Sequence, residues 1–199
     1  MDPPGPLVLL NANASDLMPL RRWPGERYVA LARQLLDQFP DVRIVFTGAP
    51  GEAAAAQRLV DQVGSARCVS LAGRTSLRQL LVLCALADVL VSNDSGPAHF
   101  ATLTDVDVVV LFGPETPVLF ASPSPRTHVL WAGLACSPCV NAFNDRVSPC
   151  TNNLCMQALT VEQVGRAVGR CLEGRRPADV PAAAWAEDEA RPAAARFIE

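Results

Sequence analysis

The sequence lacks the features that mark several specialised classes of protein. Its 199 residues carry a net charge of −3 and 6% aromatic residues, and no basic stretch is interleaved with aromatic side chains. Binding to nucleic acid is therefore disfavoured. The first residues form no basic segment ahead of an apolar one, so no secretory signal is expected. The most apolar stretch, residues 80–87, is far shorter than the ~20 residues of a membrane helix.

These absences predict a cytoplasmic protein whose association with a membrane, at the inner face of the plasma membrane, is peripheral. The chain contains seven cysteines, and an odd number argues against a fully disulfide-paired secreted scaffold. Cys68, Cys84 and Cys171 lie in apolar or helical surroundings and are expected to be buried thiols. No internal repeat is present.

The composition does support a folded core. Half of the residues are hydrophobic and 19% are charged, which is typical of a globular domain. Short apolar runs alternate with segments of helical periodicity, which predicts an α/β fold with a Rossmann-like parallel sheet flanked by helices. Expected strands cover residues 7–10, 42–46, 68–71, 89–91 and 108–112, with one more near 129–131. Expected helices cover residues 26–39, 53–63, 77–85, the segment after 97, and 160–171.

The domain is expected to span residues 1–172, with a Cys-rich loop at 136–155. Residues 173–199 are rich in alanine, proline and charge and have no strong apolar period. They are therefore expected to form a tail, with one helical piece near Trp185.

The segment Ser92–His99, with sequence SNDSGPAH, is the most informative part of the chain. It follows an apolar strand and precedes a helix, so backbone N–H groups of Ser95 and Gly96 are left free to bind phosphate. Asp94 offers an acceptor for sugar hydroxyls, and His99 follows about one helical turn later, within reach of the same pocket. In parallel sheets the carboxyl ends of the strands share one edge, so the polar turns of this chain are expected to form one site.

Five motifs in order resemble glycosyltransferase family 9, the heptosyltransferases of lipopolysaccharide assembly. They are NANAS at 11–15 with RRWP at 21–24, GAPGE at 48–52, AGRTSL at 72–77, SNDSGPAH at 92–99 and FGPETP at 112–117. The resemblance covers roughly residues 7–172. It implies the C-terminal, donor-binding half of a two-domain GT-B enzyme, whose N-terminal acceptor domain supplies the catalytic base. No catalytic residue is therefore expected in this chain.

The resemblance and the residue chemistry together predict a donor site for a nucleotide-diphosphate sugar. Its expected members are Ser15, Arg21, Glu52, Thr75, Asp94, Ser95, Gly96 and His99. Arg21 would neutralise the leaving diphosphate, and Glu52 would accept hydrogen bonds from ribose hydroxyls. We expect Arg21, Glu52 and Asp94 to surround one cavity. Other roles stay open for the site residues. They are a solvated surface residue for Arg21, a helix-start acid for Glu52, a general base for Asp94, a helix-capping turn for Ser95 and Gly96, and a buried structural residue for His99.

Four cysteines in the loop, at 136, 139, 150 and 155, have spacings that suit a structural zinc site. Disulfides and free thiols remain alternatives. The predicted transfer itself needs no obligatory metal, because Arg21 and the helix start supply positive charge.

The leading hypothesis is the donor-binding domain of an inverting glycosyltransferase that uses ADP-heptose or a similar donor. Its acceptor would be a lipopolysaccharide-type or other glycan, or a lipid-linked one, held by the missing N-terminal domain. The alternative is a non-catalytic module that binds a nucleotide sugar or docks a partner. An epimerase of the same doubly wound class lacks support, because no Gly-x-Gly-x-x-Gly follows the first strand.

Overall fold

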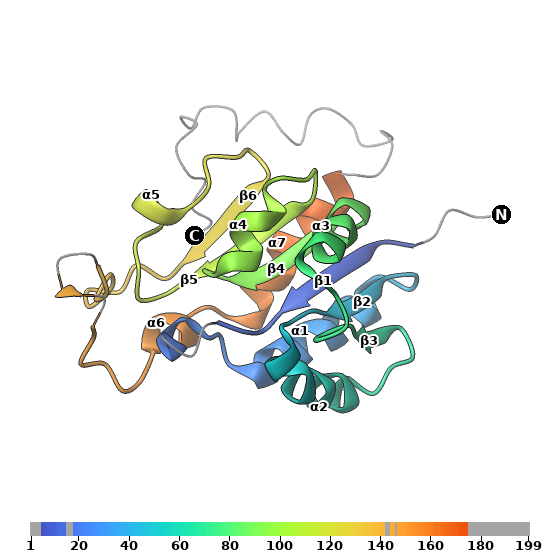
Figure 1. Ribbon diagram of the computed structural model, residues 1–199, viewed down its shortest axis with the longest axis horizontal. Helices are drawn as coiled ribbons and strands as arrows, with labels where there is room; N and C mark the ends of the chain where they lie inside the picture. The colour runs from blue at the N-terminus through green and yellow to red at the C-terminus, as the bar shows by residue number, and fades with distance from the viewer. Residues whose placement is uncertain (1–4, 15–17, 142–143, 146, 175–199) are drawn as a thin grey trace.

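A computed structural model describes residues 5–14, 18–141, 144–145 and 147–174. Its centre is a six-stranded parallel sheet with the strand order β3-β2-β1-β4-β5-β6 (Figure 1). This is the order of a doubly wound Rossmann-type sheet, so the predicted fold class is confirmed. The strands are β1 (Leu7–Asn11), β2 (Arg43–Phe46), β3 (Cys68–Ser70), β4 (Val89–Asn93), β5 (Asp107–Phe112) and β6 (Thr127–Trp131).

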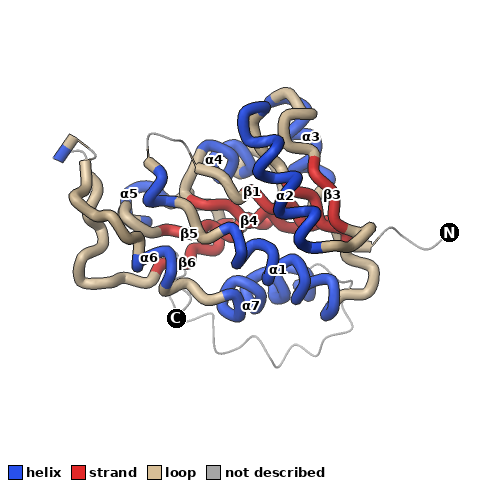
Figure 2. Tube along the Cα trace, turned by 90° about the horizontal axis from the view of Figure 1, so that it is seen from below, coloured by secondary structure: helices blue, strands red, loops and turns tan. Residues whose placement is uncertain are grey.

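Helices cover both faces of the sheet. They are α1 (Gly25–Gln38), α2 (Ala53–Val63), α3 (Leu77–Leu86), α4 (Gly96–Ala101), α5 (Pro117–Phe120), α6 (Leu154–Gln157) and α7 (Val161–Gly174), with 3-10 turns η1 (Pro19–Arg21) and η2 (Pro50–Glu52). Buried side chains of α1, α2 and α7 share one core with the sheet, and those of α3 and α4 share another. Figure 2 shows α1 and α7 on one side of the sheet and α3 and α4 on the other.

Local sequence explains where the helices begin and end. The α2 helix stops at Gly64, whose φ of 72° is the left-handed conformation that glycine adopts without strain. The α3 helix begins at Ser76, which accepts a hydrogen bond from the N–H of Gln79 and donates its own N–H to the Gln79 side chain. Thr160 and Gln163 form the same reciprocal cap at the start of α7.

The parallel sheet places the turns after β1, β2, β3, β4 and β5 at one edge. Neighbouring strands in the sheet pair in parallel. For example, Leu10 of β1 lies opposite Phe46 of β2 and Val91 of β4, so the carboxyl ends of these strands point the same way. Among the described residues, no helix is long and apolar enough to cross a membrane. The expected tail and the helical piece near Trp185 lie outside the described residues.

Candidate functional site

A cavity of about 380 Å³ opens at the carboxyl edge of the sheet, above β1, β2 and β4. Its walls come from the turns after β1, β2, β3 and β4 and from the first residues of α3 and α4. They consist of Asn11, Asn13, Ala14, Gly48, Ala49, Pro50, Glu52, Thr75, Ser76, Leu77, Leu80, Ser95, Gly96, Pro97 and Phe100. β1 and β4 are neighbours in the sheet, and after β3 the chain crosses back to place β4 on the other side of β1. Open α/β sheets bind ligands where the strand order reverses in this way.

The turn after β2 brings a carboxylate to the cavity. Glu52 Oε2 accepts a hydrogen bond of 2.6 Å from the N–H of Ala49, which fixes the orientation of the carboxylate. A Cβ atom at Gly48 would lie 2.9 Å from Glu52 Oε2 and 2.7 Å from Asn13 Nδ2. Only glycine therefore lets these two polar side chains approach the turn.

The turn after β4 presents backbone donors to the cavity. Pro97 has no N–H, and the N–H of Ala98 bonds to Ser95 O at 3.1 Å. The hydrogen bonds found among the described residues leave the N–H groups of Ser95 and Gly96 without an acceptor. Two adjacent donors at a turn are a suitable binding element for an anionic oxygen.

Part of the cavity lining is apolar. Leu77 is 54% exposed and Phe100 is 41% exposed, and Leu80 and Pro97 also line the cavity. Exposed large side chains around a polar floor are typical of pockets that bind ligands with both a flat apolar part and a charged part.

Beside the cavity, four charged side chains form a compact cluster. Arg21 Nη2 lies 2.5 Å from Glu115 Oε1, and Arg21 Nε lies 3.7 Å from Asp94 Oδ2. Arg21 Nη1 also donates to Asp94 O at 3.3 Å. The side chains of Asp94 and Glu115 are 4% and 3% exposed, so two nearly buried carboxylates share one guanidinium. Arg21 Nε, Asp94 Oδ2 and Glu115 Oε1 are buried without a hydrogen bond among the described residues.

His99 completes this cluster at its solvent side. His99 Nε2 lies 3.5 Å from Asp94 Oδ1, and the His99 side chain is half exposed. The hydrogen bond to Asp94 raises the pKa of His99 above its ordinary value, while partial burial and Arg21 oppose that shift. His99 therefore carries positive charge to a higher pH than a free histidine, and in its protonated form it is a second cation next to the cavity.

Asn93 holds the loop that follows β1 against the end of β4. Its Oδ1 accepts the N–H of Trp23 at 3.0 Å and the hydroxyl of Tyr28 at 3.3 Å, and its Nδ2 donates to Asn13 O at 3.1 Å. Asn93 is fully buried, so these bonds are shielded from water. This side chain determines where the loop that carries Arg21 meets the turn that carries Asp94.

The structure brings the predicted site residues together in two adjacent groups. Glu52, Thr75, Ser95 and Gly96 line the cavity. Arg21, Asp94 and His99 form the charged cluster next to it and do not line the cavity itself. The expectation that Arg21, Glu52 and Asp94 surround one cavity is therefore wrong in that form, because Glu115 and Asp94 hold Arg21 on the β5 side. Ser15 lies outside the described residues.

Two residues of the site were not predicted. Glu115 belongs to the motif FGPETP and follows β5, just as Asp94 follows β4. An acidic residue after the end of the neighbouring strand could therefore have indicated its place beside Arg21. Asn93 lies in the motif SNDSGPAH. Its role was not predicted, because its hydrogen bonds connect it to segments that are distant in the chain.

The loop cysteines are free thiols with different surroundings. Cys136 is exposed, and Cys155 is buried. Cys139 Sγ accepts the hydroxyl of Ser148 at 3.2 Å, and Cys150 Sγ contacts Asn152 O at 3.1 Å. In the part of the chain that the structure describes, no three of these sulfur atoms come within 4.8 Å of one another. The structural zinc site stays a prediction.

The structure is a Rossmann-like α/β domain with a cavity at the carboxyl edge of its sheet. Residues 2–147 match the model of glycosyltransferase family 9 (heptosyltransferase). The chain therefore belongs to glycosyltransferase family 9, as its motifs predicted.

Individual relatives agree with this assignment. A lipopolysaccharide heptosyltransferase 2 of Salmonella typhimurium is 35% identical over 119 residues, which cover 58% of this chain and 34% of that protein. The Escherichia coli ADP-heptose lps heptosyltransferase II superposes with a TM-score of 0.70 at 23% identity, over 89% of this chain and 49% of its own. Escherichia coli heptosyltransferase WaaC with ADP gives a TM-score of 0.62 at 24% identity, over 84% and 44%. The chain thus spans between a third and a half of the length of these relatives.

Proposed function

We propose that this chain is the donor-binding part of an inverting glycosyltransferase and that it holds a nucleotide-diphosphate sugar of the ADP-heptose type. The observation that carries the proposal is the cavity itself. It combines a carboxylate, two backbone N–H groups that have no acceptor among the described residues, and apolar side chains, at the edge of the sheet where Rossmann-type folds bind nucleotides.

Each wall of the cavity suits one part of such a donor. Glu52 can accept two hydrogen bonds from the ribose hydroxyls, as an acid after a Rossmann strand does. The base would lie against the apolar side chains of Leu77 and Phe100, next to Thr75. The diphosphate would accept hydrogen bonds from the N–H groups of Ser95 and Gly96, where glycine permits close approach.

The charged cluster would act on the sugar and on the leaving group. Asp94 Oδ2 is a buried acceptor without a hydrogen bond among the described residues, so a sugar hydroxyl could satisfy it. Arg21 and His99 supply positive charge beside the diphosphate, which stabilises the negative charge that develops as the nucleoside diphosphate leaves. No obligatory metal is required for that purpose.

The base that deprotonates the acceptor hydroxyl is assigned to another part of the enzyme. Asp94 is almost fully buried and contacts Arg21 and His99, so its carboxylate is not exposed to an acceptor hydroxyl. In this proposal a further domain binds the glycan or lipid-linked acceptor and supplies the base. The in-line attack on the anomeric carbon would invert its configuration.

A second candidate function is a module that binds a nucleotide sugar without transferring it. A coding sequence that continues upstream into a second Rossmann-like domain would favour the transferase.

Thermal unfolding with a panel of ADP, GDP, UDP, CDP and ADP-heptose tests the donor site. A ligand at ~100 Kd adds about 2.7 kcal/mol to the stability of the folded chain. We expect the ADP compounds to raise Tm most. Glu52→Ala should remove most of this shift, whereas Glu173→Ala, an exposed carboxylate at the end of α7, should keep it. Equal shifts in both variants would contradict the assignment of Glu52.

Calorimetry with the same donor tests the charged cluster. Asp94→Ala and Arg21→Ala each remove a charge-assisted contact, and such contacts contribute about 1.5–3 kcal/mol. We therefore expect affinity to fall by roughly 10-fold to 100-fold in each folded variant. An unchanged affinity in both variants would remove Asp94 and Arg21 from the donor site.

A further inference from the structure

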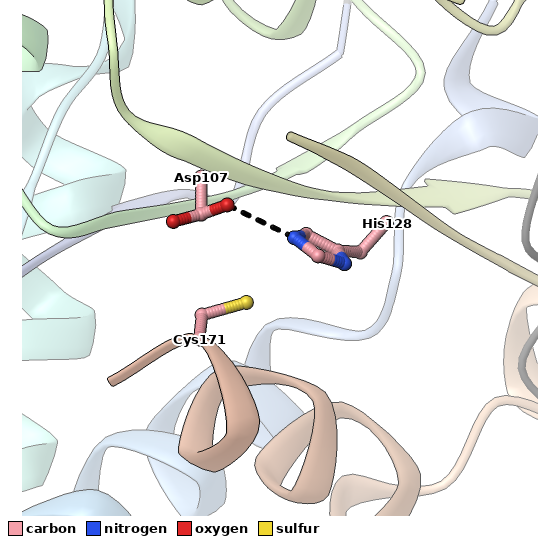
Figure 3. Close-up of side chains that lie close together, drawn as sticks. All are labelled: Asp107, His128 and Cys171. Carbon is pink, nitrogen blue, oxygen red and sulfur yellow. Dashed lines mark hydrogen bonds and ion pairs between the residues drawn. The ribbon is translucent and has the colours of Figure 1, made fainter. Parts of the chain in front are cut away.

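A second group of chemically reactive side chains lies at the opposite edge of the sheet. Asp107 is the first residue of β5, His128 is the second residue of β6, and Cys171 lies near the end of α7. One carboxylate oxygen, one ring nitrogen and the sulfur all lie within 4.8 Å of one another. Figure 3 shows the three side chains pointing toward a common centre, with the sulfur below the gap between Asp107 and His128.

The strand register explains why these residues meet. His128 pairs with Val109 across β5 and β6, and Asp107 is two residues from Val109, so Asp107 and His128 share a face of the sheet. Val109 packs in the same core as Cys171 of α7. Three elements distant in the chain therefore deliver one oxygen, one nitrogen and one sulfur to the same place.

From this arrangement we propose that Asp107, His128 and Cys171 form a site for a borderline-soft divalent cation of the Zn²⁺ class. A tetrahedral zinc with Zn–N, Zn–O and Zn–S bonds of about 2.0–2.3 Å separates its ligand atoms by about 3.4–3.6 Å. His128 Nε2 and Asp107 Oδ1 are already 3.1 Å apart, so small side-chain rotations are sufficient.

Binding exchanges protons for the metal. The Cys171 thiol releases its proton and binds as thiolate, and the His128 nitrogen that faces Asp107 binds through its lone pair, with the ring proton on the other nitrogen. One carboxylate and one thiolate then balance the two charges of the cation. Arg126 Nη1 lies 3.7 Å from Asp107 Oδ2, but the Arg126 side chain is 45% exposed and can turn toward solvent.

Three protein ligands leave one position of a tetrahedral cation open. Cys171 is 7% exposed, whereas the side chains of His128 and Asp107 are 28% and 13% exposed. Water can therefore reach the cation from the His128 side. The bound cation would fasten α7 to β5 and β6 at the edge of the sheet that is farthest from the candidate donor site.

Cobalt(II) binding tests this site, because thiolate-to-cobalt charge transfer gives an absorption band that reports a bound cysteine. The loop cysteines are first removed in a background variant with Cys136→Ser, Cys139→Ser, Cys150→Ser and Cys155→Ser. The folded background is expected to show the band with one equivalent of cobalt and a higher Tm with the metal. Adding Cys171→Ser or His128→Ala should abolish both effects. Adding Cys84→Ser, a buried thiol on the other face of the sheet, should preserve them.

A folded background without the band, or a band that persists after Cys171→Ser, would overturn the proposal. If the background does not fold, the unmodified chain and its Cys171→Ser variant are compared by the number of zinc ions bound per chain. One ion fewer in Cys171→Ser supports the site, and equal numbers overturn it. Neither measurement depends on nucleotide binding, so the result is independent of the proposed function.

Discussion

Arg21 is a single guanidinium placed between two nearly buried carboxylates, those of Asp94 and Glu115. Removing one partner of a buried ion pair costs about 3–5 kcal/mol, because the other charge stays buried without compensation. The cluster is therefore expected to stabilise the fold only as a unit.

A double-mutant cycle tests whether Arg21 and Glu115 act as a unit. Arg21→Met should lower the free energy of unfolding by several kcal/mol, on the order of the 3–5 kcal/mol for a broken buried pair. Adding Glu115→Gln should restore part of that loss, with a coupling energy of about 1–3 kcal/mol. Urea unfolding of the four proteins gives these values. Losses that simply add would show that the two side chains are independent.

The contact between His99 and Asp94 predicts a pH-dependent contribution to stability. Because the folded pKa of His99 is raised above 6.5, the contribution is fully present below the unfolded pKa. It is lost as the pH rises through the folded pKa. The stability difference between the unaltered chain and His99→Gln should therefore shrink as the pH increases from below 6.5. A difference that is constant with pH, or that grows, would contradict the contact.

At the scale of single elements, sequence pattern was informative for all six strands. Apolar runs predicted β1 to β5 and one more strand near β6, and capping residues at Ser76 and Thr160 predicted where two helices begin. The short helices α5 and α6 were not predicted, because four residues are too few to show a period of 3.6.

The same reasoning explains which parts of the site could be predicted. Glu52, Ser95 and Gly96 follow directly from the turns at the ends of β2 and β4. The pairing of Arg21 with Glu115 and the convergence on Cys171 depend on contacts between segments far apart in the chain. No local pattern specifies such contacts before the strand order is known.

Two glycines of α7 offer a matched test of how closely this helix packs. A Cβ at Gly169 would meet only Phe39 Cζ, at 3.9 Å, whereas a Cβ at Gly165 would clash with the Gln34 amide of α1. Gly169→Ala should therefore raise the free energy of unfolding by up to about 1 kcal/mol, the gain in helix propensity. Gly165→Ala should gain less, because the amide at the end of the flexible Gln34 side chain has to move aside. Equal effects in urea unfolding would contradict the close packing of α1 against α7.

At the scale of the whole molecule, the two edges of the sheet have different chemistry. The carboxyl edge carries the cavity with its backbone donors and the Arg21 cluster. The amino edge carries Asp107 and His128, which face Cys171 of α7. Parallel strands make this separation possible, because all of their carboxyl ends lie on one side.

The central claim is that the cavity at the carboxyl edge binds the nucleotide diphosphate. A titration of the ¹⁵N-labelled chain with ADP, followed by amide chemical shifts, tests it most directly. We expect the N–H signals of Gly48, Glu52, Ser95 and Gly96 to move with the bound fraction. The signals of Gly165, Gly169 and Arg170, which line a groove between α1 and α7, should stay in place. Shifts confined to that groove, or no saturable shift at any amide, would contradict the claim.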